Sequence, residues 1–299
     1  MNPFRGILPA VVTPFDSEEE FAPRTFEGLL ERLYRKGVHG IYVCGQTGEG
    51  LLQPVAQRKR VAEVAVKNSP AGKQVIVHVG AHRTSEAIEL ARHASQIGAQ
   101  AISSLAPNGP YSFAEIQAYY RALAAVSDVP VLIYYFPEVC PTVHSLNQIS
   151  SLCEIPNVIG LKFTDFDLFK LSTLHQHGHT VFNGRDEILV AGLLMGADGG
   201  IGSFYTLVPE LFLQVYELAQ TGQWDKAREV QNVINELIAI TIRFPVFPAI
   251  RCMLAWSGLD CGRCLEPRRS LSAQEESTLR DQLSKSKLAE SILSRVAPS

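Results

Sequence analysis

Short apolar segments alternate along the first two thirds of the chain with longer segments whose apolar residues recur every three or four positions. Apolar runs bounded by turn residues predict buried strands, and the longer spacing predicts amphipathic helices. The predicted strands lie at residues 6–15, 40–45, 74–80, 101–107, 129–136, 158–165, 180–183 and 199–203. The predicted helices between them lie at 26–34, 55–67, 84–97, 112–125, 145–153, 167–175 and 187–195.

This alternation predicts the fold class. Eight strand–helix repeats indicate an α/β protein whose parallel sheet closes into a (β/α)8, or TIM, barrel, because open doubly wound sheets usually have fewer strands. No G-x-G-x-x-G motif follows the first strand, which speaks against a dinucleotide-binding sheet. Two helix starts carry capping signals: Ser112 and Glu115 have capping-box spacing, and Thr84 is expected to be an N-cap.

Beyond about residue 207 only helical patterns remain, interrupted by prolines and by a stretch rich in Gly, Cys and Pro. The helical segments are 207–220, 224–242, 247–257 and 273–293. We therefore predict a barrel over residues 1–220 and a C-terminal helical extension over 221–299 that packs on it.

The composition limits the kinds of binding partner and the cellular compartment that can be expected. The net charge of −3 gives no strong field to attract nucleic acid or an anionic membrane. The first residues show no basic stretch followed by a long apolar one, and no run reaches about 18 apolar residues, so neither a signal peptide nor a membrane span is predicted. The six cysteines are scattered, and Cys261–Cys264 is a lone C-x-x-C, so we expect reduced, unrelated thiols and a cytoplasmic protein.

Lys162 interrupts an apolar strand, Val158–Asp165. Lysine seldom occupies a buried strand, because its ammonium group is costly to desolvate. One hypothesis is an edge strand from which the lysine reaches water. The other is a buried lysine that is paired with an acid or kept partly neutral, and a neutral amine is a nucleophile toward carbonyl carbons.

Other candidate groups fall at the C-terminal ends of the predicted strands, where barrel enzymes carry their active sites. Gly45–Glu49 can form a tight turn whose N–H groups converge on a small anion such as a carboxylate, although an ordinary Gly-rich turn fits equally well. Strand alternation sends one phenol of Tyr134-Tyr135 into the barrel and the other toward the helices, and a packed aromatic is the alternative for either. Further polar or turn residues at strand ends are Thr164, Gly184, Arg185, Asp186, Glu187 and Ser203.

Together these groups favour a Schiff-base aldolase. The lysine would condense with a 2-keto group, a phenol would move protons, and fixed dipoles would hold the acid. The expected partner is a small-molecule 2-keto acid such as pyruvate. No cofactor or metal is called for, and the sequence has no H-E-x-x-H, no paired metal-ligand spacing and no P-loop.

At these motifs the chain resembles a known family, the dihydrodipicolinate synthase/N-acetylneuraminate lyase family of class I, lysine-dependent aldolases. The motifs that carry the resemblance are Gly45-Gln-Thr-Gly-Glu49, Tyr134-Tyr-Phe-Pro137, Gly160-Leu-Lys162 and Gly196-Ala-Asp-Gly-Gly-Ile-Gly-Ser203. The synthase branch has an arginine that binds a second carboxylate where this chain has Val139, so the chain is more similar to the lyase branch. The resemblance implies an oxo-acid lyase that cleaves N-acetylneuraminate to N-acetylmannosamine and pyruvate.

The resemblance also implies roles for individual residues. Lys162 would form the Schiff base, Tyr134 would relay protons, and Thr47, with the N–H groups of Gln46 and Thr47, would hold the pyruvoyl carboxylate. The residues implied to bind the sugar chain are Thr164, Gly184, Asp186, Glu187 and Ser203. Members of the family usually assemble as tetramers, so a homo-oligomer is expected.

Three features depart from the family's pattern. Gln46 stands where the carboxylate loop normally has a hydroxyl residue, Arg185 stands beside the acidic pair, and Tyr111 is out of step with the position of a second relay phenol. Gln46 and Arg185 motivate an alternative substrate, another 2-keto-3-deoxy sugar acid or a 4-hydroxy-2-oxo acid, for an aldolase or dehydratase. A third hypothesis, of another class, is a non-catalytic protein that binds keto acids.

Overall fold

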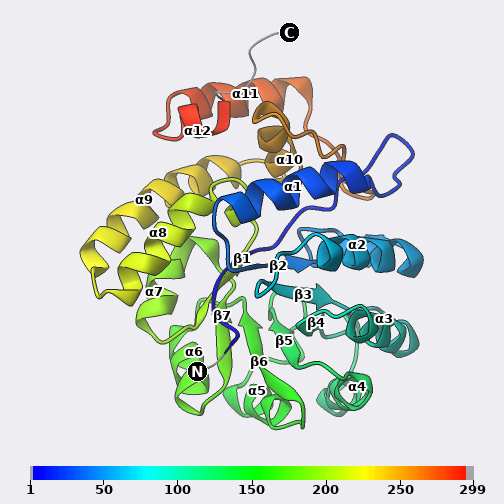
Figure 1. The fold of residues 1–299 in the computed structure, drawn as a ribbon. Helices are drawn as coiled ribbons and strands as arrows, with labels where there is room; N and C mark the ends of the chain where they lie inside the picture. Colours follow the sequence, from blue (N-terminus) through cyan, green and yellow to red (C-terminus); the bar gives the residue numbers. More distant parts are fainter. Residues whose placement is uncertain (1–2, 294–299) are drawn as a thin grey trace.

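Eight parallel strands close into a barrel with helices on its outside (Figure 1) in a computed structural model that describes residues 3–293. The strands are β1 (Gly6–Pro9), β2 (Gly40–Val43), β3 (Gln74–His78), β4 (Ala101–Leu105), β5 (Val131–Tyr135), β6 (Val158–Phe163), β7 (Thr180–Asn183) and β8 (Gly199–Gly202). The strands pair in the order β1-β8-β7-β6-β5-β4-β3-β2. A bridge between Ala10 and Tyr42 connects the chain after β1 to β2 and closes the barrel. The predicted (β/α)8 barrel is confirmed.

The barrel helices follow the predicted ones closely. They are α1 (Pro23–Arg35), α2 (Val55–Lys67), α3 (Thr84–Gln96), α4 (Phe113–Val126), α5 (Leu146–Cys153), α6 (Leu168–Gln176), α7 (Leu189–Leu194) and α8 (Pro209–Gln220). The capping box of Ser112 and Glu115 is confirmed. The N-cap prediction for Thr84 is wrong by one position, because Arg83 has the extended backbone of the cap and Thr84 is already helical.

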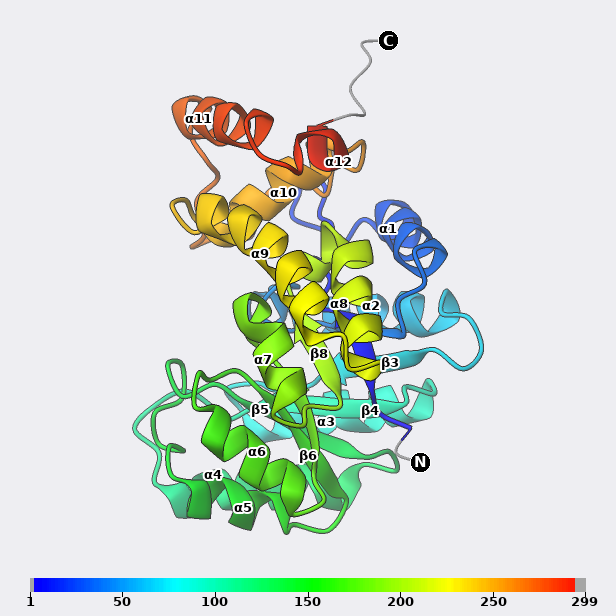
Figure 2. The same ribbon diagram turned by 90° about the vertical axis from the view of Figure 1, so that its left-hand side faces the viewer.

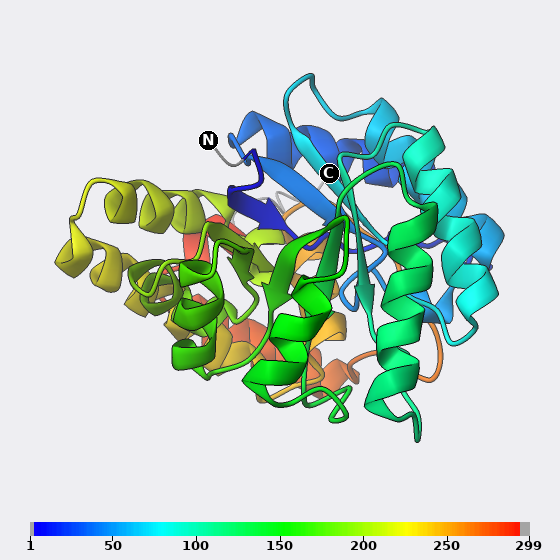
Figure 3. The same ribbon diagram turned by 90° about the horizontal axis from the view of Figure 1, so that it is seen from below.

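The apolar residues form two layers because side chains of a strand alternate between its faces. The inner layer, inside the barrel, contains Leu8, Tyr42, Ile76, Leu132, Tyr134, Phe182 and Ile201. The outer layer lies between the strands and the ring of helices, and Figures 1 and 3 show that ring from two directions. A register shift between Val131 and Leu132 brings Tyr134 of β5 opposite Lys162 of β6. The two strand ends that carry candidate chemistry are therefore neighbours.

The C-terminal part is helical. It comprises α9 (Trp224–Thr241), α10 (Val246–Trp256), α11 (Ala273–Ser284) and α12 (Ala289–Leu293), and Figure 2 shows α10 to α12 at one end of the molecule. The helical pattern predicted over 273–293 is broken between α11 and α12, where the Leu288 N–H donates to the Ser286 hydroxyl at 3.2 Å. The described residues exclude 1, 2 and 294–299. The start of the segment that was searched for a signal peptide and the end of the predicted helical extension are therefore not described.

Apolar stretches in these helices raise the question of a membrane span. Among residues 3–293 no single helix is both long and apolar enough to cross a membrane. Helices α9 and α10 meet that test only as a pair that is bent by 112°.

A buried ion pair ties the C-terminal helices to the barrel. Arg251 of α10 contacts the Glu49 carboxylate at 2.5 Å, and both side chains are almost fully excluded from solvent. The same guanidinium donates to the carbonyls of Thr13 and Cys261, while the second Glu49 oxygen accepts from the Leu265 N–H at 2.8 Å. The sequence indicated Glu49 only as part of a possible anion-binding turn. Its carboxylate instead anchors that turn to α10.

Replacing Arg251 with Leu should lower the free energy of unfolding by about 3–5 kcal/mol, because the Glu49 carboxylate stays buried without its partner. Thermal and urea unfolding measure the loss. The matched control is Arg228→Leu, which removes an exposed pair with Asp225 and should cost about 1 kcal/mol or less. Equal losses in the two variants would contradict the anchoring role of Arg251.

Candidate active site

Lys162 lies inside the barrel near the C-terminal end of β6. Its strand pairs with β5 on one side and β7 on the other, and the residue is only 5% exposed, so the edge-strand hypothesis is wrong. The amine nitrogen lies 4.1 Å from the ring centre of Tyr134 and 4.7 Å from that of Tyr42. Burial lowers the pKa of Lys162 from 10.5 to about 7, and the negative charge of Asp186 opposes that shift. Near neutral pH a large share of this amine is therefore uncharged and nucleophilic.

Tyr134 is the inward-facing phenol of the pair on β5. Its ring meets Tyr42 edge-on at 6.1 Å between centroids, whereas Tyr135 packs outside the barrel, where its hydroxyl donates to Asp165 at 3.2 Å. The alternation predicted for the pair is confirmed. Burial raises the pKa of Tyr134, and the hydroxyl of Thr164 acts in the opposite direction. The phenol is thus protonated at neutral pH and available as a proton donor.

Asp186 is buried in a one-turn 3-10 helix, Asp186–Ile188, that follows β7. One of its oxygens accepts from the Phe204 N–H at 2.8 Å. Burial raises the pKa of Asp186 to about 7, with Phe204 and Lys162 acting to lower it. Gly202 is required here, because a Cβ on it would stand 1.8 Å from an Asp186 oxygen. The charges of Asp186 and Lys162 therefore influence each other, and each favours the charged form of the other.

The turn after β2 supplies backbone donors. Within residues 3–293 the N–H groups of Gln46 and Thr47 donate to no protein acceptor. The Thr47 hydroxyl is 2.6 Å from the hydroxyl of Ser203, which follows β8, and either can be the donor. Cys44, at the start of the turn, has a left-handed backbone with φ 58. Two free N–H groups and a hydroxyl pair are suited to a carboxylate.

The remaining candidates surround this cluster to different extents. Gly184 lies against Thr164, and a Cβ at residue 184 would come within 2.1 Å of the threonine hydroxyl oxygen. The Thr164 hydroxyl is buried without a well-aligned partner in the described residues. Glu187 acts on the cluster only through its charge, which helps to raise the pKa of Asp186. The side chain of Gln46 accepts a hydrogen bond from Arg268 at 3.5 Å.

Sequence reasoning missed Tyr42 and His78, which complete the aromatic walls of the site. The Leu105 N–H donates to His78 Nε2 at 3.0 Å, so Nδ1 carries the proton and donates to the Cys44 carbonyl at 3.0 Å. Burial, Arg58 and Lys162 hold the pKa of His78 well below its ordinary value. His78 is therefore a neutral, fixed wall. It interrupts an apolar strand just as Lys162 does, and that signal could have identified it.

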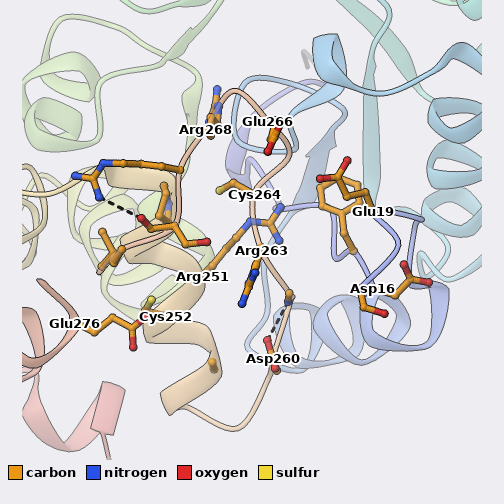
Figure 4. A pocket seen from close by; sticks show the side chains of 18 of the residues that line it. Asp16, Glu19, Arg251, Cys252, Asp260, Arg263, Cys264, Glu266, Arg268 and Glu276 are labelled. Atoms are coloured by element: carbon orange, nitrogen blue, oxygen red, sulfur yellow. Dashed lines mark hydrogen bonds between the residues drawn. The ribbon is translucent and has the colours of Figure 1, made fainter. Parts of the chain in front are cut away.

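A cavity of about 920 Å³ lies between α10, the loop after β1 and the segment 260–271, and neither Lys162 nor Tyr134 lines it (Figure 4). The candidate active site is therefore identified by its reactive side chains and not by the volume of this cavity. Arg268, in its wall, is the residue that contacts Gln46. Cys264 also lines it, and burial raises the pKa of its thiol to about 11. All six cysteines are free, and residues 3–293 contain no group of three or more His, Cys, Asp or Glu side chains placed to hold a metal ion.

A parallel eight-stranded barrel with a buried lysine beside a phenol at its C-terminal mouth is the arrangement expected of a class I aldolase. The comparisons show that the chain is a carbon–carbon lyase. The chain belongs to the dihydrodipicolinate synthetase family, whose model matches residues 3–286.

Several similar proteins carry names from the lyase branch of that family. The chain is 33% identical to N-acetylneuraminate lyase of Rhizobium meliloti, over 92% of this chain and 93% of that protein. It is 35% identical to N-acetylneuraminate lyase 2 of Escherichia coli O6:H1, over 86% and 85%. A solved structure of the Ruminococcus gnavus sialic acid aldolase, a catalytic lysine mutant, superposes with a TM-score of 0.91 at 29% identity and covers 98% of this chain and 96% of its own.

The rate at which a 2-keto acid reacts with Lys162 should rise with pH through about 7, because only the neutral amine adds to a ketone. Asp186→Asn removes a charge that raises the pKa of Lys162, so the midpoint should move to lower pH. Initial rates of pyruvate trapping with cyanoborohydride, followed by mass spectrometry, give both midpoints. A wild-type rate that rises only near the ordinary lysine pKa, or an upward shift in the variant, would contradict the assignment.

Proposed function

We propose that the chain is a Schiff-base lyase that cleaves a 2-keto acid to pyruvate and an aldehyde, with Lys162 as the nucleophile. The observation that carries the proposal is the burial of the Lys162 amine against Tyr134, with a pKa of about 7. A non-catalytic binding protein is disfavoured, because such a protein has no need of a desolvated, reactive amine next to a proton donor.

The reaction follows from the positions of the groups. The Lys162 amine adds to the C2 carbonyl of the keto acid, and loss of water gives a protonated imine. Tyr134, acting with Thr164, gives its proton to the water that leaves as the imine forms. The resulting phenolate accepts the proton of the C4 hydroxyl while the C3–C4 bond breaks and its electron pair moves toward the iminium nitrogen. The aldehyde leaves, the enamine takes a proton at C3, and water releases pyruvate from Lys162.

The two ends of the substrate have separate candidate sites. The free N–H groups of Gln46 and Thr47, with the Thr47–Ser203 hydroxyl pair, are suited to the carboxylate next to the ketone. We assign the hydroxyl-bearing remainder to Thr164, Gly184, Asp186, Glu187 and Ser203. Ser203 lies next to Thr47 and therefore borders both sets of residues.

N-acetylneuraminate is the leading substrate, because the similar proteins named above carry N-acetylneuraminate lyase or sialic acid aldolase in their names. The products would be N-acetylmannosamine and pyruvate. Gln46 and Arg185 favour a second candidate within the same chemistry, another 2-keto-3-deoxy sugar acid or a 4-hydroxy-2-oxo acid. Release of pyruvate from a panel of these acids separates the two candidates.

Two further properties belong to the proposal. The free thiols fit a reducing, cytoplasmic compartment. Resemblance to the family and the frequency of symmetric assemblies support a homo-oligomer, with a tetramer as the expected form. Sedimentation as a monomer at micromolar concentration would contradict the second property.

Pyruvate and borohydride together should add one reduced three-carbon adduct to the wild-type protein, on the peptide that contains Lys162. Lys162→Arg, which keeps a long basic side chain but cannot form the imine, should show no adduct and no release of pyruvate from any 2-keto acid. Intact-mass and peptide mass spectrometry provide the readout. An adduct elsewhere, or none in the wild type, would overturn the proposal.

Tyr134→Phe should lower kcat for cleavage by about 10²- to 10⁴-fold, because it removes the proton relay. Trapping of pyruvate on Lys162 should persist, since the aromatic ring over the amine remains. Steady-state release of pyruvate and the trapping assay test the two statements on the same preparations. A variant that cleaves at the wild-type rate would exclude this phenol as the relay.

A further inference from the structure

Arg185 lies at the mouth of the barrel, and the proposed reaction assigns it no role. It follows β7 and precedes Asp186, and its side chain is only 15% exposed. Its guanidinium carbon lies 4.4 Å from the ring centre of Phe166 and 5.4 Å from that of Phe136. Those two residues follow β6 and β5, so three neighbouring strand ends meet at this cation.

A short chain of contacts links this cation to the reacting amine. Phe136 stacks on Tyr134, with 6.0 Å between ring centroids and 18° between the planes, and Tyr134 in turn covers the Lys162 nitrogen. The charge of Arg185 also acts to lower the pKa of Tyr134. The guanidinium therefore belongs to the surroundings of the reaction centre rather than to the remote surface.

The donors of Arg185 are only partly used. One Nη contacts the carboxylate of Glu138, a side chain that is 60% exposed, and exposed ion pairs contribute little and exchange readily. The Nε–H is buried and has no partner among residues 3–293. A buried donor without an acceptor is unfavourable, and a planar fork held between two rings is pre-organised for an anion that can take two hydrogen bonds.

The cation of Arg185 at the mouth of the barrel is suited to an anionic group of the substrate other than the carboxylate next to the ketone. The carboxylate beside the ketone is already matched by the Gln46–Thr47 turn. Asp186 cannot serve as the anion of Arg185, because that carboxylate accepts from the Phe204 N–H and has a pKa of about 7.

We propose that Arg185 is a specificity-determining residue that binds a carboxylate or phosphate on the aldehyde half of the 2-keto acid. This inference rests on the proposed function and narrows its substrate class. In a matched pair of substrates that differ only in this group, the doubly anionic member is preferred. Glu138 occupies the same donors when the substrate is absent.

The test uses the condensation direction, with pyruvate and two matched pairs of aldehydes. Glyceraldehyde is compared with glyceraldehyde 3-phosphate, and acetaldehyde with glyoxylate, so that the two pairs separate phosphate from carboxylate recognition. In the wild type, kcat/KM for the anionic member of at least one pair should exceed that of its neutral partner by about 10-fold or more. The preference should appear chiefly in KM.

Variants then assign the preference to the guanidinium. Arg185→Ala should lower the anionic-to-neutral ratio by about 10- to 100-fold, and Arg185→Lys, which keeps the charge but loses the fork, should fall between. Glu138→Gln should lower KM for the anionic aldehyde, because the competing carboxylate is gone. Arg228→Ala removes an exposed arginine of α9 and is the control for net charge, so it should leave the ratio at its wild-type value.

The outcomes distinguish the specificity role of Arg185 from the proposed Schiff-base chemistry. A wild type that prefers the neutral member of both pairs, or an Arg185→Ala variant with an unchanged ratio, overturns the specificity role. Borohydride trapping of pyruvate is measured on the same proteins. Loss of trapping in the wild type would overturn the proposed function itself, whereas intact trapping without charge preference would overturn only this inference.

Discussion

The desolvated amine of Lys162 is the feature on which the rest of the site depends. Keeping this amine neutral near pH 7 rather than near 10.5 corresponds to about 5 kcal/mol of lost preference for its charged form. That cost is imposed by the inner layer of the barrel, where Tyr42 and Tyr134 cover the nitrogen and exclude water. A rigid surrounding structure is required, because a looser one would let water in and restore the charge.

Other buried polar groups at the mouth of the barrel help to hold the site around the desolvated amine of Lys162. Asp186 supplies negative charge while the Phe204 N–H fixes its orientation, and Gly202 leaves the space that the carboxylate needs. The Glu49–Arg251 pair holds the turn after β2 against α10, so that the turn's free N–H groups keep their positions. The C-terminal helices thus stabilise the geometry of the site although they contribute none of its reactive atoms.

Polarity is distributed asymmetrically around the lysine. The turn after β2 offers the uncharged N–H donors of Gln46 and Thr47, whereas the cation of Arg185 lies near the rings of Phe136 and Phe166. The two ends of a 2-keto acid would therefore meet groups of different charge. The same imine chemistry can therefore serve different acids in related barrels, because the groups that choose the substrate lie at strand ends apart from the amine.

The sequence by itself determined the alternation of strands and helices, and with it the barrel, because the periods of 2 and 3.6 residues are local properties of the chain. It also singled out Lys162, since a charged residue in an apolar run is conspicuous without any structure. Only the tertiary structure decided what surrounds that amine. Tyr42 and His78, and the Arg251 that anchors Glu49, come from segments far apart in the chain, and no local pattern encodes their contact. Burial sets the pKa of the lysine, and burial is a property of the whole packed barrel rather than of any one strand.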